Sequence, residues 1–397
     1  MYSADNYSIK SYGAMVNDHA RCQPFVDALT RLVTPSSVVL DLGTGTGFFA
    51  LLAVKLGALR VYAIEPDDAI EIGKLCARGL PGSERITWLQ GLSTDLELPE
   101  KADIIIGDLH GNLPFYNNMI PSLADARRRF LAEGGALLPT RDILRVVPAH
   151  APHEYKELDH PWRENRSDLD LSAGRGFVAN SWWRARRDPA RSEDLLSTAA
   201  VWGVIDFTTA ETATLDNSLR FTIERPGTMH GYYVWFDSEL AGNAGASNAP
   251  DLSELVYGRC FFPLELPVEV AAGDRVDLRL STKPIDQSQV YRWDSRILDA
   301  NGVPRAEFRQ STFRSRPIAR RDLQRAAANH RPVLNLDGMV DHAVIQAMAA
   351  SETLGQIAER LAARFPQRFA TPAKALDHVA KLSKKYSSGI DRASVHE

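Results

Sequence analysis

The sequence predicts an α/β domain with a parallel sheet, followed by an antiparallel β-barrel domain and a C-terminal helical module. Three observations carry this prediction. Between residues 31 and 140, short β-branched runs alternate with helical periods, which is typical of βαβ units. Residues 141–318 hold short alternating runs separated by Gly, Pro and Asp, as in an antiparallel sheet. Residues 319–397 show mostly helical spacing.

The elements of the parallel domain follow in chain order. Strands are expected in "SSVVLDLG", "LRVYAIEP" and "ADIIIGDL", and helices in "FFALLAVKLGA" and "DAIEIGKLCARGL". A further helix in "DARRRFLAEGGALLPT" should end at Gly134 and Gly135, and another strand should follow it.

The later segments carry equally clear patterns. "SLRFTIE", "GYYVWFDSEL", "CFFPLELPVEV" and "RVDLRLSTKP" are expected strands of the barrel. After a short strand near "RPVLNL", three helices are compatible with a winged-helix-like module. Two of these helices begin at Ser/Thr caps and place their apolar residues on one face. Those residues are Leu354, Ile357, Leu361 and Phe365 in one helix, and Leu376, Val379 and Leu382 in the other.

Length and composition exclude several classes of protein. A chain of 397 residues suggests two or three domains. A formal net charge of -4 disfavours wholesale binding to nucleic acid or to an acidic membrane. Three scattered cysteines without a CxxC pair indicate neither a disulfide framework nor a metal site, and fit a reducing, cytoplasmic compartment. No signal peptide or membrane-spanning stretch is expected.

The stretch "DLGTGTGFFA" at residues 41–50 is the first chemical signal. Glycine at every second position lets a ligand approach the backbone, and the following helix offers its N-terminus to negative charge. The next strand ends in Glu65, which can accept hydrogen bonds from two ribose hydroxyls. No Gly-Lys-Ser/Thr follows, which argues against a P-loop. The pattern fits a dinucleotide or S-adenosylmethionine, or a turn that only permits close packing.

With these residues in order, the sequence resembles the protein arginine methyltransferases. These are class I S-adenosylmethionine-dependent enzymes with a Rossmann-like domain followed by a β-barrel. The resemblance covers residues 7 to 300 and implies S-adenosylmethionine as the cofactor. The matching segments are "SYGAMVNDHAR", "VVLDLGTGTG", "AIEP", "ADARRRFLAEGGALLPT", "GYYVWFDSEL" and "PLELPVEVAAGDRV".

The resemblance assigns a cofactor site residue by residue. Arg21 would bind the methionine carboxylate, the turn from Gly43 to Gly47 would lie against the cofactor, and Glu65 would hold the ribose. Tyr7 and Tyr12 would pack over the cofactor, or would only pack their helix on the domain. The expected cofactor-binding residues are Tyr12, Met15, Arg21, Asp41, Gly43, Gly45, Gly47, Glu65, Pro66, Thr94 near the adenine, and Asp108.

The acceptor site departs from the family pattern. Two glutamates that grip a guanidinium in the family fall here on Asp108 and Asn117, in "GDLHGNLPFYNNM". One shortened carboxylate and one amide supply half the charge of that clamp, so arginine is a disfavoured acceptor. The family's Thr-His-Trp loop falls on Leu255, Val256 and Tyr257, without its histidine.

The same hairpin still carries groups able to act in catalysis. Asp108 and His110 follow a parallel strand, where catalytic groups of such sheets gather. Either would orient or deprotonate an amine, imidazole, hydroxyl or carboxyl acceptor, and the alternative is a local hydrogen bond within the loop. Asn112 and Asn117 would bind the acceptor or serve their turn. The expected catalytic residues are Asp108, His110 and Asn117, and no metal is required.

Two further segments indicate partners. Residues 158–190, with Trp162, Trp182 and Trp183 among arginines, lie where the family carries a dimerisation arm. The same mixture, including Arg184, Arg186 and Arg187, could stack on single-stranded nucleic acid, although the acidic chain favours a homodimer. The helical module would capture a leader peptide, a carrier or another protein, or would cap the barrel. The expected domains are 1–30, 31–147, 148–318 and 319–397.

The sequence therefore predicts a methyltransferase with a remodelled acceptor site. Its acceptor would be a nitrogen or oxygen of a peptide or an amino-acid-derived natural product. A divergent arginine methyltransferase is the alternative enzyme. A cofactor-binding pseudoenzyme or an RNA-associated regulator is the alternative from another class.

Overall fold

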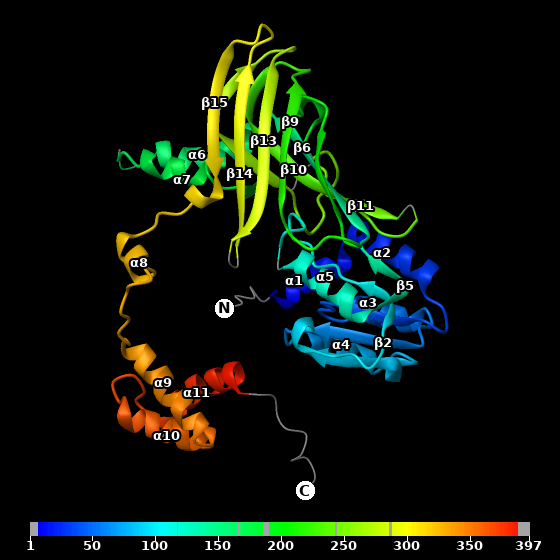
Figure 1. Ribbon diagram of the computed structural model, residues 1–397, viewed down its shortest axis with the longest axis vertical. Coiled ribbons are helices and arrows are strands. Elements are labelled where there is room, and N and C mark those ends of the chain that lie inside the picture. Colours follow the sequence, from blue (N-terminus) through cyan, green and yellow to red (C-terminus); the bar gives the residue numbers. More distant parts are fainter. Residues whose placement is uncertain are drawn as a thin grey trace. The chain divides into compact units, whose positions relative to one another are not determined.

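The computed structural model describes residues 7–116, 118–164, 167, 169–185, 190–242, 244–285 and 288–387. The chain divides into two compact units, Met1–Pro317 and Ile318–Glu397 (Figure 1). Within the described ranges, no helix combines the length and the apolar character needed to cross a membrane.

The predicted parallel sheet is present in the first unit. Its strand order is β3-β2-β1-β4-β5, and every recorded pair is parallel. The order reverses between β1 and β4, and ligand sites in open sheets of this type lie at such a reversal. The strands are β1 (Val38–Leu42), β2 (Arg60–Glu65), β3 (Ile86–Gln90), β4 (Ala102–Ile106) and β5 (Leu131–Leu138).

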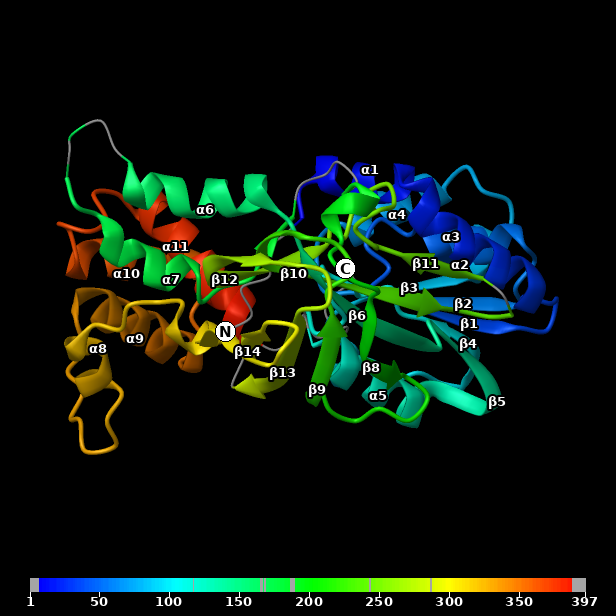
Figure 2. The ribbon, with the colours of Figure 1, turned by 90° about the horizontal axis from the view of Figure 1, so that it is seen from above.

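Helices cover both faces of this sheet because its strands are apolar on both sides. Figure 2 shows α3 and α4 on one face and α5 on the other. Val39 and Ile106 pack with Phe25 on the first face, whereas Leu40 packs with Leu123 on the second. The helices are α1 (Ile9–Asn17), α2 (His19–Leu32), α3 (Phe48–Lys55), α4 (Ile70–Ala77) and α5 (Met119–Phe130), with short 3-10 segments η1 (Ser83–Arg85) and η2 (Ser93–Asp95).

The predicted end of α5 is wrong. The helix ends at Phe130, and Leu131 already has extended backbone angles. Gly134 and Gly135 instead lie inside β5, where the register with β4 shifts. Gly134 has a φ of 72°, which glycine adopts without strain, so the pair forms an irregularity within the strand.

The antiparallel part consists of two sheets. One has the order β7-β12-β10-β6-β8, with β11 paired to β10, and the other the order β15-β14-β13-β9. Among the described residues no strand pair joins the two sheets, so the continuous ring of a closed barrel is not shown. The strands are β6 (Arg141–Ala149), β7 (Trp183–Arg184), β8 (Ala200–Asp206), β9 (Leu215–Thr222), β10 (Gly227–Glu239), β11 (Gly245–Ser247), β12 (Cys260–Val270), β13 (Arg275–Ile285), β14 (Ser288–Leu298) and β15 (Pro304–Ser311).

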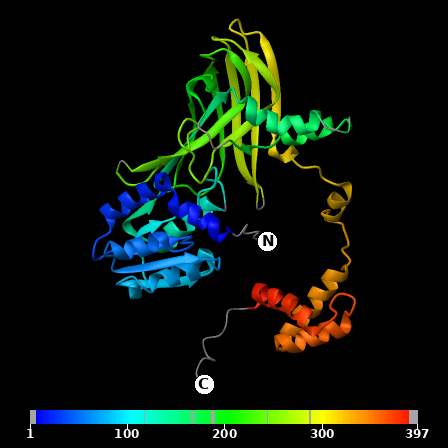
Figure 3. The ribbon, with the colours of Figure 1, turned by 180° about the vertical axis from the view of Figure 1, so that it is seen from behind.

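A helical arm leaves the antiparallel sheets between β6 and β7. It contains α6 (Pro152–Arg163), η3 (Ser172–Gly174) and α7 (Arg175–Val178), and the green helices extend away from the sheets in Figure 3. A Cβ placed on Gly174 would overlap the indole of Trp162, so the glycine lets η3 pack against the end of α6. The short segments η4 (Ser192–Asp194) and η5 (Thr312–Arg314) complete this unit.

The second unit is a small helical bundle. Its helices are α8 (Arg320–Arg325), α9 (Leu336–Ala349), α10 (Leu354–Arg364) and α11 (Pro372–Tyr386). The predicted caps are present, because Thr353 and Thr371 accept hydrogen bonds from the first turns of α10 and α11. The short strand expected near "RPVLNL" is absent, since residues 331–335 form no strand and α9 begins directly after them. The winged-helix-like variant of the module is therefore not shown.

Candidate active site

The glycine turn lies directly after β1, at the carboxyl edge of the parallel sheet. Gly43, Gly45 and Gly47 have φ values of 73°, 53° and 85°, all in the left-handed region. A Cβ on Gly45 would lie 2.8 Å from Cε1 of Tyr12, and a Cβ on Gly43 would overlap the Leu109 side chain. The turn therefore meets α1 on one side and the loop after β4 on the other.

Two acidic side chains fix this turn. Asp41 accepts hydrogen bonds from Oγ1 of Thr44 at 2.5 Å and from the backbone of Ala50 at 2.9 Å. Burial raises its pKa to about 7. Glu65, at the end of β2, accepts from the backbone of Gly45 at 2.8 Å, and burial raises its pKa as well. Asp41 thus ties the turn to α3, and Glu65 ties it to β2.

Arg21 reaches the same edge from α2. Its Nη2 lies 2.5 Å from Oδ2 of Asp108, its Nε donates to the Tyr257 hydroxyl at 3.2 Å, and its Nη1 donates to the Met15 carbonyl at 2.9 Å. Burial alone would lower the pKa of Arg21, but the Asp108 carboxylate raises it overall. The guanidinium is a permanent buried cation.

Asp108 stands at the centre of the site. Its side chain is 3% exposed and faces Arg21 through Oδ2. Oδ1 accepts from the Tyr257 hydroxyl at 2.6 Å and lies 3.0 Å from Nδ1 of His110. Burial opposes ionisation, but Arg21 and then His110 hold the pKa of Asp108 well below its usual range. The carboxylate is therefore charged and has three polar partners, Arg21, Tyr257 and His110.

His110 is enclosed between two carboxylates. Nδ1 faces Asp108, and Nε2 lies 2.8 Å from Oδ2 of Asp142 on β6. Although burial opposes protonation, Asp142 and then Asp108 raise the pKa of His110 to about 9. At neutral pH the ring is thus an imidazolium, which donates protons and accepts none. The expectation that His110 would act as a base does not fit this protonation state.

Sequence reasoning missed the contribution of Asp142. Along β6 the burial alternates, which places Asp142 on the inner face together with Leu144 and Val146. That alternation was readable in "TRDILRVV", where a carboxylate occupies a position of core periodicity. The hydroxyl of Tyr257, in the loop that corresponds to the family's Thr-His-Trp segment, was likewise not assigned a role. It donates to Asp108 at 2.6 Å, and its pKa is raised well above the usual value by burial and by Asp108.

Of the other expected residues, Met15 contacts the cluster through its backbone, and the rest lie elsewhere. Tyr12 is over the glycine turn, where its pKa is raised by burial and by Glu65. Met15 contributes its backbone carbonyl to Arg21. Pro66 and Thr94 are exposed, at the end of β2 and in η2. Asn117 lies outside the described residues, and the Nδ2 of Asn112 is buried without a hydrogen-bond partner among those described.

The donor set fits S-adenosylmethionine. Three of the five N–H donors of Arg21 face oxygen atoms. The other two can bind the carboxylate of the cofactor's methionine part, and one of them lies on Nη1, which is 3.5 Å from the Cys22 sulfur. Each oxygen of Glu65 accepts one backbone hydrogen bond, at Gly45 and Asp67, and retains capacity for a hydroxyl donor. The glycines of the turn are packed closely by the side chains of Leu109, Tyr12 and Trp88. Among the described residues, no cluster of three or more His, Cys, Asp or Glu side chains could hold a metal ion.

Comparisons with known proteins match methyltransferases. Residues 17–138 match the model of the ribosomal protein L11 methyltransferase family. A probable protein arginine N-methyltransferase 6 of Arabidopsis thaliana is 30% identical over 294 residues, which cover 72% of this chain and 67% of that protein. A probable histone-arginine methyltransferase CARM1 of Oryza sativa is 29% identical over 288 residues, covering 68% of this chain. This chain spans only 54% of that relative's length.

Solved structures show the same fold at lower identity. The Trypanosoma brucei PRMT1 enzyme-prozyme complex with AdoHcy superposes with a TM-score of 0.68 at 19% identity, covering 76% of this chain and 96% of that one. Arabidopsis thaliana protein arginine methyltransferase 10 gives a TM-score of 0.66 at 18% identity, covering 77% and 97%.

Proposed function

Because the chain belongs to the protein arginine N-methyltransferase family of class I S-adenosylmethionine-dependent enzymes, we propose that it methylates a nitrogen or oxygen atom of a peptide. One observation carries the acceptor class. The single carboxylate described at the acceptor position, Asp108, already faces two cations, Arg21 and His110. A guanidinium would be the third cation at that carboxylate. A neutral nitrogen or a carboxylate oxygen avoids this repulsion and needs no strong base.

The residues of the site take defined roles in this proposal. Bound S-adenosylmethionine supplies an electrophilic methyl group on a sulfonium. The free donors of Arg21 would bind its carboxylate, and Glu65 would accept from its ribose hydroxyls. Asp108 and Tyr257 would orient the acceptor for an in-line displacement, because both side chains are fixed by hydrogen bonds at the sheet edge. His110, as an imidazolium, would hold Asp108 in place.

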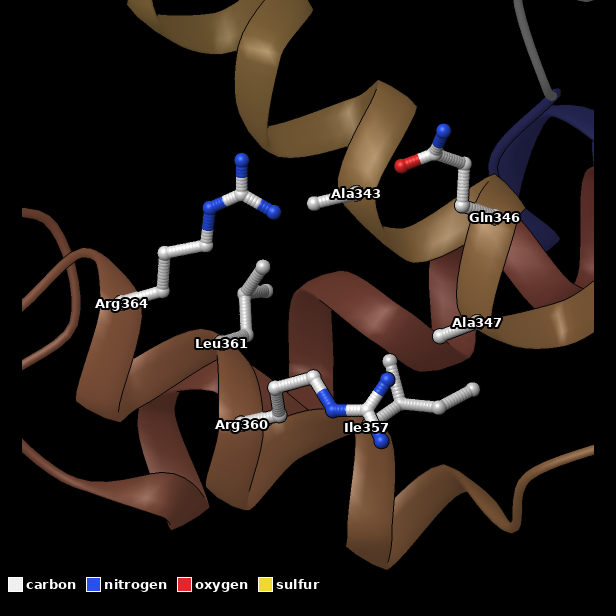
Figure 4. Close-up of a pocket in the computed structure, with 7 residues that line it drawn as sticks. All are labelled: Ala343, Gln346, Ala347, Ile357, Arg360, Leu361 and Arg364. Atoms are coloured by element: carbon white, nitrogen blue, oxygen red, sulfur yellow. The ribbon is translucent and has the colours of Figure 1, made fainter. Parts of the chain in front are cut away.

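The second unit supports a peptide acceptor. Figure 4 shows a pocket between α9 and α10 with an apolar floor of Ala347, Ile357 and Leu361, and with Arg360 and Arg364 at its edge. Residues 319–397 hold 12 Lys and Arg against 8 Asp and Glu, which gives this part a formal net charge of +4. Because the whole chain has a net charge of -4, residues 1–318 have a net charge of -8. An acidic segment of the acceptor peptide complements this cationic pocket. The names of the relatives point to protein acceptors and do not support a natural-product acceptor.

A homodimer and a cytoplasmic setting complete the proposal. The arm exposes apolar side chains, including Leu171 at 41% and Phe177 at 37%, which suits a contact with a second copy. Cys22, Cys76 and Cys260 are free, which fits a reducing compartment.

Arginine methylation is the second candidate, because relatives of this chain are named as arginine methyltransferases. It requires Asp108 to release one of its present partners to a guanidinium. Formation of monomethylarginine or dimethylarginine would therefore favour this candidate.

The test begins with the cofactor. Calorimetric titration with S-adenosylmethionine should show binding by the native protein and about 100-fold weaker binding by Glu65→Ala, which removes the ribose acceptor. Glu71→Ala on the exposed face of α4 is the matched control and should bind normally, since Glu71 is 59% exposed and pairs with Lys74 at the surface. A well-folded native protein that does not bind would remove both candidates.

The acceptor class is then tested with a labelled methyl donor. The protein is incubated with a set of acidic peptides that differ only at one central residue. That residue is Arg, Lys, His, Gln or Glu, and mass spectrometry identifies the methylated products. We expect label on a peptide whose central residue is neutral or acidic. Label only on the arginine peptide would establish the second candidate instead.

A further inference from the structure

We infer that Asp142 and His110 form a built-in cation that makes the site select against cationic acceptors, with Asp142 acting as a positioning residue. The inference rests on the proposed methyltransferase function and deepens it. It assigns acceptor specificity to His110 and Asp142. Neither residue stands at the two positions, Asp108 and Asn117, where the family carries its pair of glutamates. Asp142 acts through His110 and contacts no reacting atom.

The geometry requires hydrogens on both ring nitrogens. Carboxylate oxygens lie 3.0 Å from Nδ1 and 2.8 Å from Nε2 of His110. Between two ionised carboxylates, a neutral imidazole would point a lone pair at one of these oxygens, which is repulsive at such a distance. The ring side chain is 1% exposed and the Asp142 side chain 0%, so water cannot relieve the repulsion. Both carboxylates accept a hydrogen bond from the ring when His110 is an imidazolium.

Asp142 in turn depends on His110. Among the described residues, His110 is its only charged partner, and its second oxygen, Oδ1, accepts no hydrogen bond there. A buried carboxylate without a cation is costly. Asp142 is anchored in β6 by strand pairing with Ser238 on β10 and with Ile205 on β8, so it cannot follow His110 elsewhere.

Packing holds the ring between the two carboxylates. Phe236 stacks on it with ring centroids 4.7 Å apart and an interplanar angle of 11°. Phe207 meets it edge-on at 6.4 Å, and Tyr257 lies at 5.3 Å. The imidazolium is therefore a fixed part of the site, joining the loop after β4 to the antiparallel sheet.

The charges of this cluster sum to zero. Arg21 and His110 are the cations, and Asp108 and Asp142 are the carboxylates. A two-carboxylate clamp would carry a negative charge for an incoming guanidinium, whereas here His110 supplies that positive charge from within. The charged or titratable groups that face His110 are Asp108, Asp142 and the Tyr257 hydroxyl, and Arg21 acts through Asp108. Loss of the His110 charge should therefore open the site to cations.

The experiment compares binding of two peptides in the presence of S-adenosylhomocysteine. One is a short glycine-serine peptide with a single central arginine, and the other carries citrulline, the neutral analogue of arginine. We expect the native protein to bind the arginine peptide no more tightly than the citrulline peptide. In His110→Met, Asp108 loses one of its two cationic partners and the cluster loses one positive charge, so the arginine peptide should gain about tenfold over the citrulline peptide. In Asp142→Asn the gain should be smaller, because a negative charge is lost together with the charge of His110.

Folding is controlled independently. Asp277→Asn removes a carboxylate paired with Arg220 at the surface of the other sheet and should leave the native preference unchanged. Circular dichroism checks each variant, and Asp142→Glu, which keeps the charge, should restore the native preference. If Asp142→Asn does not fold, His110→Met alone decides the question.

Histidine-selective NMR supplies a readout that a structural role would not move. The ring signal of His110, identified by its loss in His110→Met, should titrate well above pH 6.5 in the native protein and at a lower pH in Asp142→Asn. Titration of native His110 near 6.5, a native preference for the arginine peptide, or no gain of that preference in the variants would each overturn the inference. These readouts need no turnover, so absence of methyl transfer would count only against the proposed function.

Discussion

Individual residues acquire opposite properties from their burial and their neighbours. His110 has two carboxylate partners, which raise its pKa to about 9 against the effect of burial. His230, on β10, forms no ion pair within the part of the chain that the structure describes: burial and then the charge of His150 lower its pKa to about 4. Its Nδ1 accepts a hydrogen bond from the backbone of Ala151 at 3.2 Å, just before α6 begins. Protonation of this nitrogen would break the bond at the base of the arm.

This contrast predicts a stability change with pH. A histidine whose folded-state pKa is depressed contributes stability that is present above its unfolded value of 6.5 and is lost as pH falls towards about 4. The melting temperature of the native protein should therefore fall between pH 6.5 and pH 4 more steeply than that of His230→Gln, whose amide can still accept from Ala151. Thermal unfolding followed by circular dichroism measures both profiles. Parallel profiles would contradict the assignment of His230 as a buried neutral group.

Some residues of the site could be predicted from the sequence, and their partners could not. Arg21, Asp108 and His110 were each named as site residues from the sequence, and the structure places them in contact. Asp142 on β6 and Tyr257 in the loop before β12 were not foreseen as partners, because they are 32 and 149 residues from the groups they bind. No local pattern specifies which inward-facing polar residue of β6 will meet which loop.

At the level of elements, small residues decide how segments join. Gly45 lets α1 close over the glycine turn, where Tyr12 occupies the space of a side chain. Gly174 lets η3 meet Trp162 at the end of α6. Periodicity located the helices around both joints, but α5 ended earlier than its sequence suggested, since pairing of Leu131 with Ala102 on β4 takes precedence over helix propensity.

The arm supplies the second prediction. Gly174→Ala should force the Trp162 indole away and cost about 1–3 kcal/mol of local packing. We expect a weaker homodimer, with the fraction of dimer falling at a given protein concentration in light scattering. Gly176→Ala is the matched control, because a Cβ there meets no atom within 4 Å. An unchanged dimer in Gly174→Ala would separate the arm from dimerisation.

For the whole molecule, the charge is divided unequally between the two units. The catalytic unit is acidic and the helical unit is basic, with Arg360 and Arg364 at the edge of the pocket between α9 and α10. Arg360 pairs with Glu352 at 2.6 Å, and Arg364 has no ion pair among the described residues. This arrangement suits capture of an acidic segment of the acceptor.

The third prediction concerns this capture. Replacing both arginines, as Arg360→Glu with Arg364→Glu, should raise KM for an acidic acceptor peptide about tenfold and leave kcat unchanged, because the substituted side chains belong to the separate helical unit. Steady-state kinetics with a labelled methyl donor measures both constants. The double variant Arg321→Glu with Arg325→Glu, on α8, changes the charge equally and is expected to leave KM near its native value. Equal effects of the two double variants would indicate general electrostatics instead of the pocket.

The sequence by itself determined the parallel sheet, the glycine turn with Glu65, and the capped helices of the second unit. These features are encoded within a few residues of one another, through hydrophobic periodicity, glycine spacing and caps. Only the tertiary structure decided that His110 lies between Asp108 and Asp142 and that the Tyr257 hydroxyl completes the cluster. The physical reason is that these contacts form between the loop after β4 and the antiparallel sheets. Packing in three dimensions therefore sets the partners, and with them the charge of His110 and the net charge of the site.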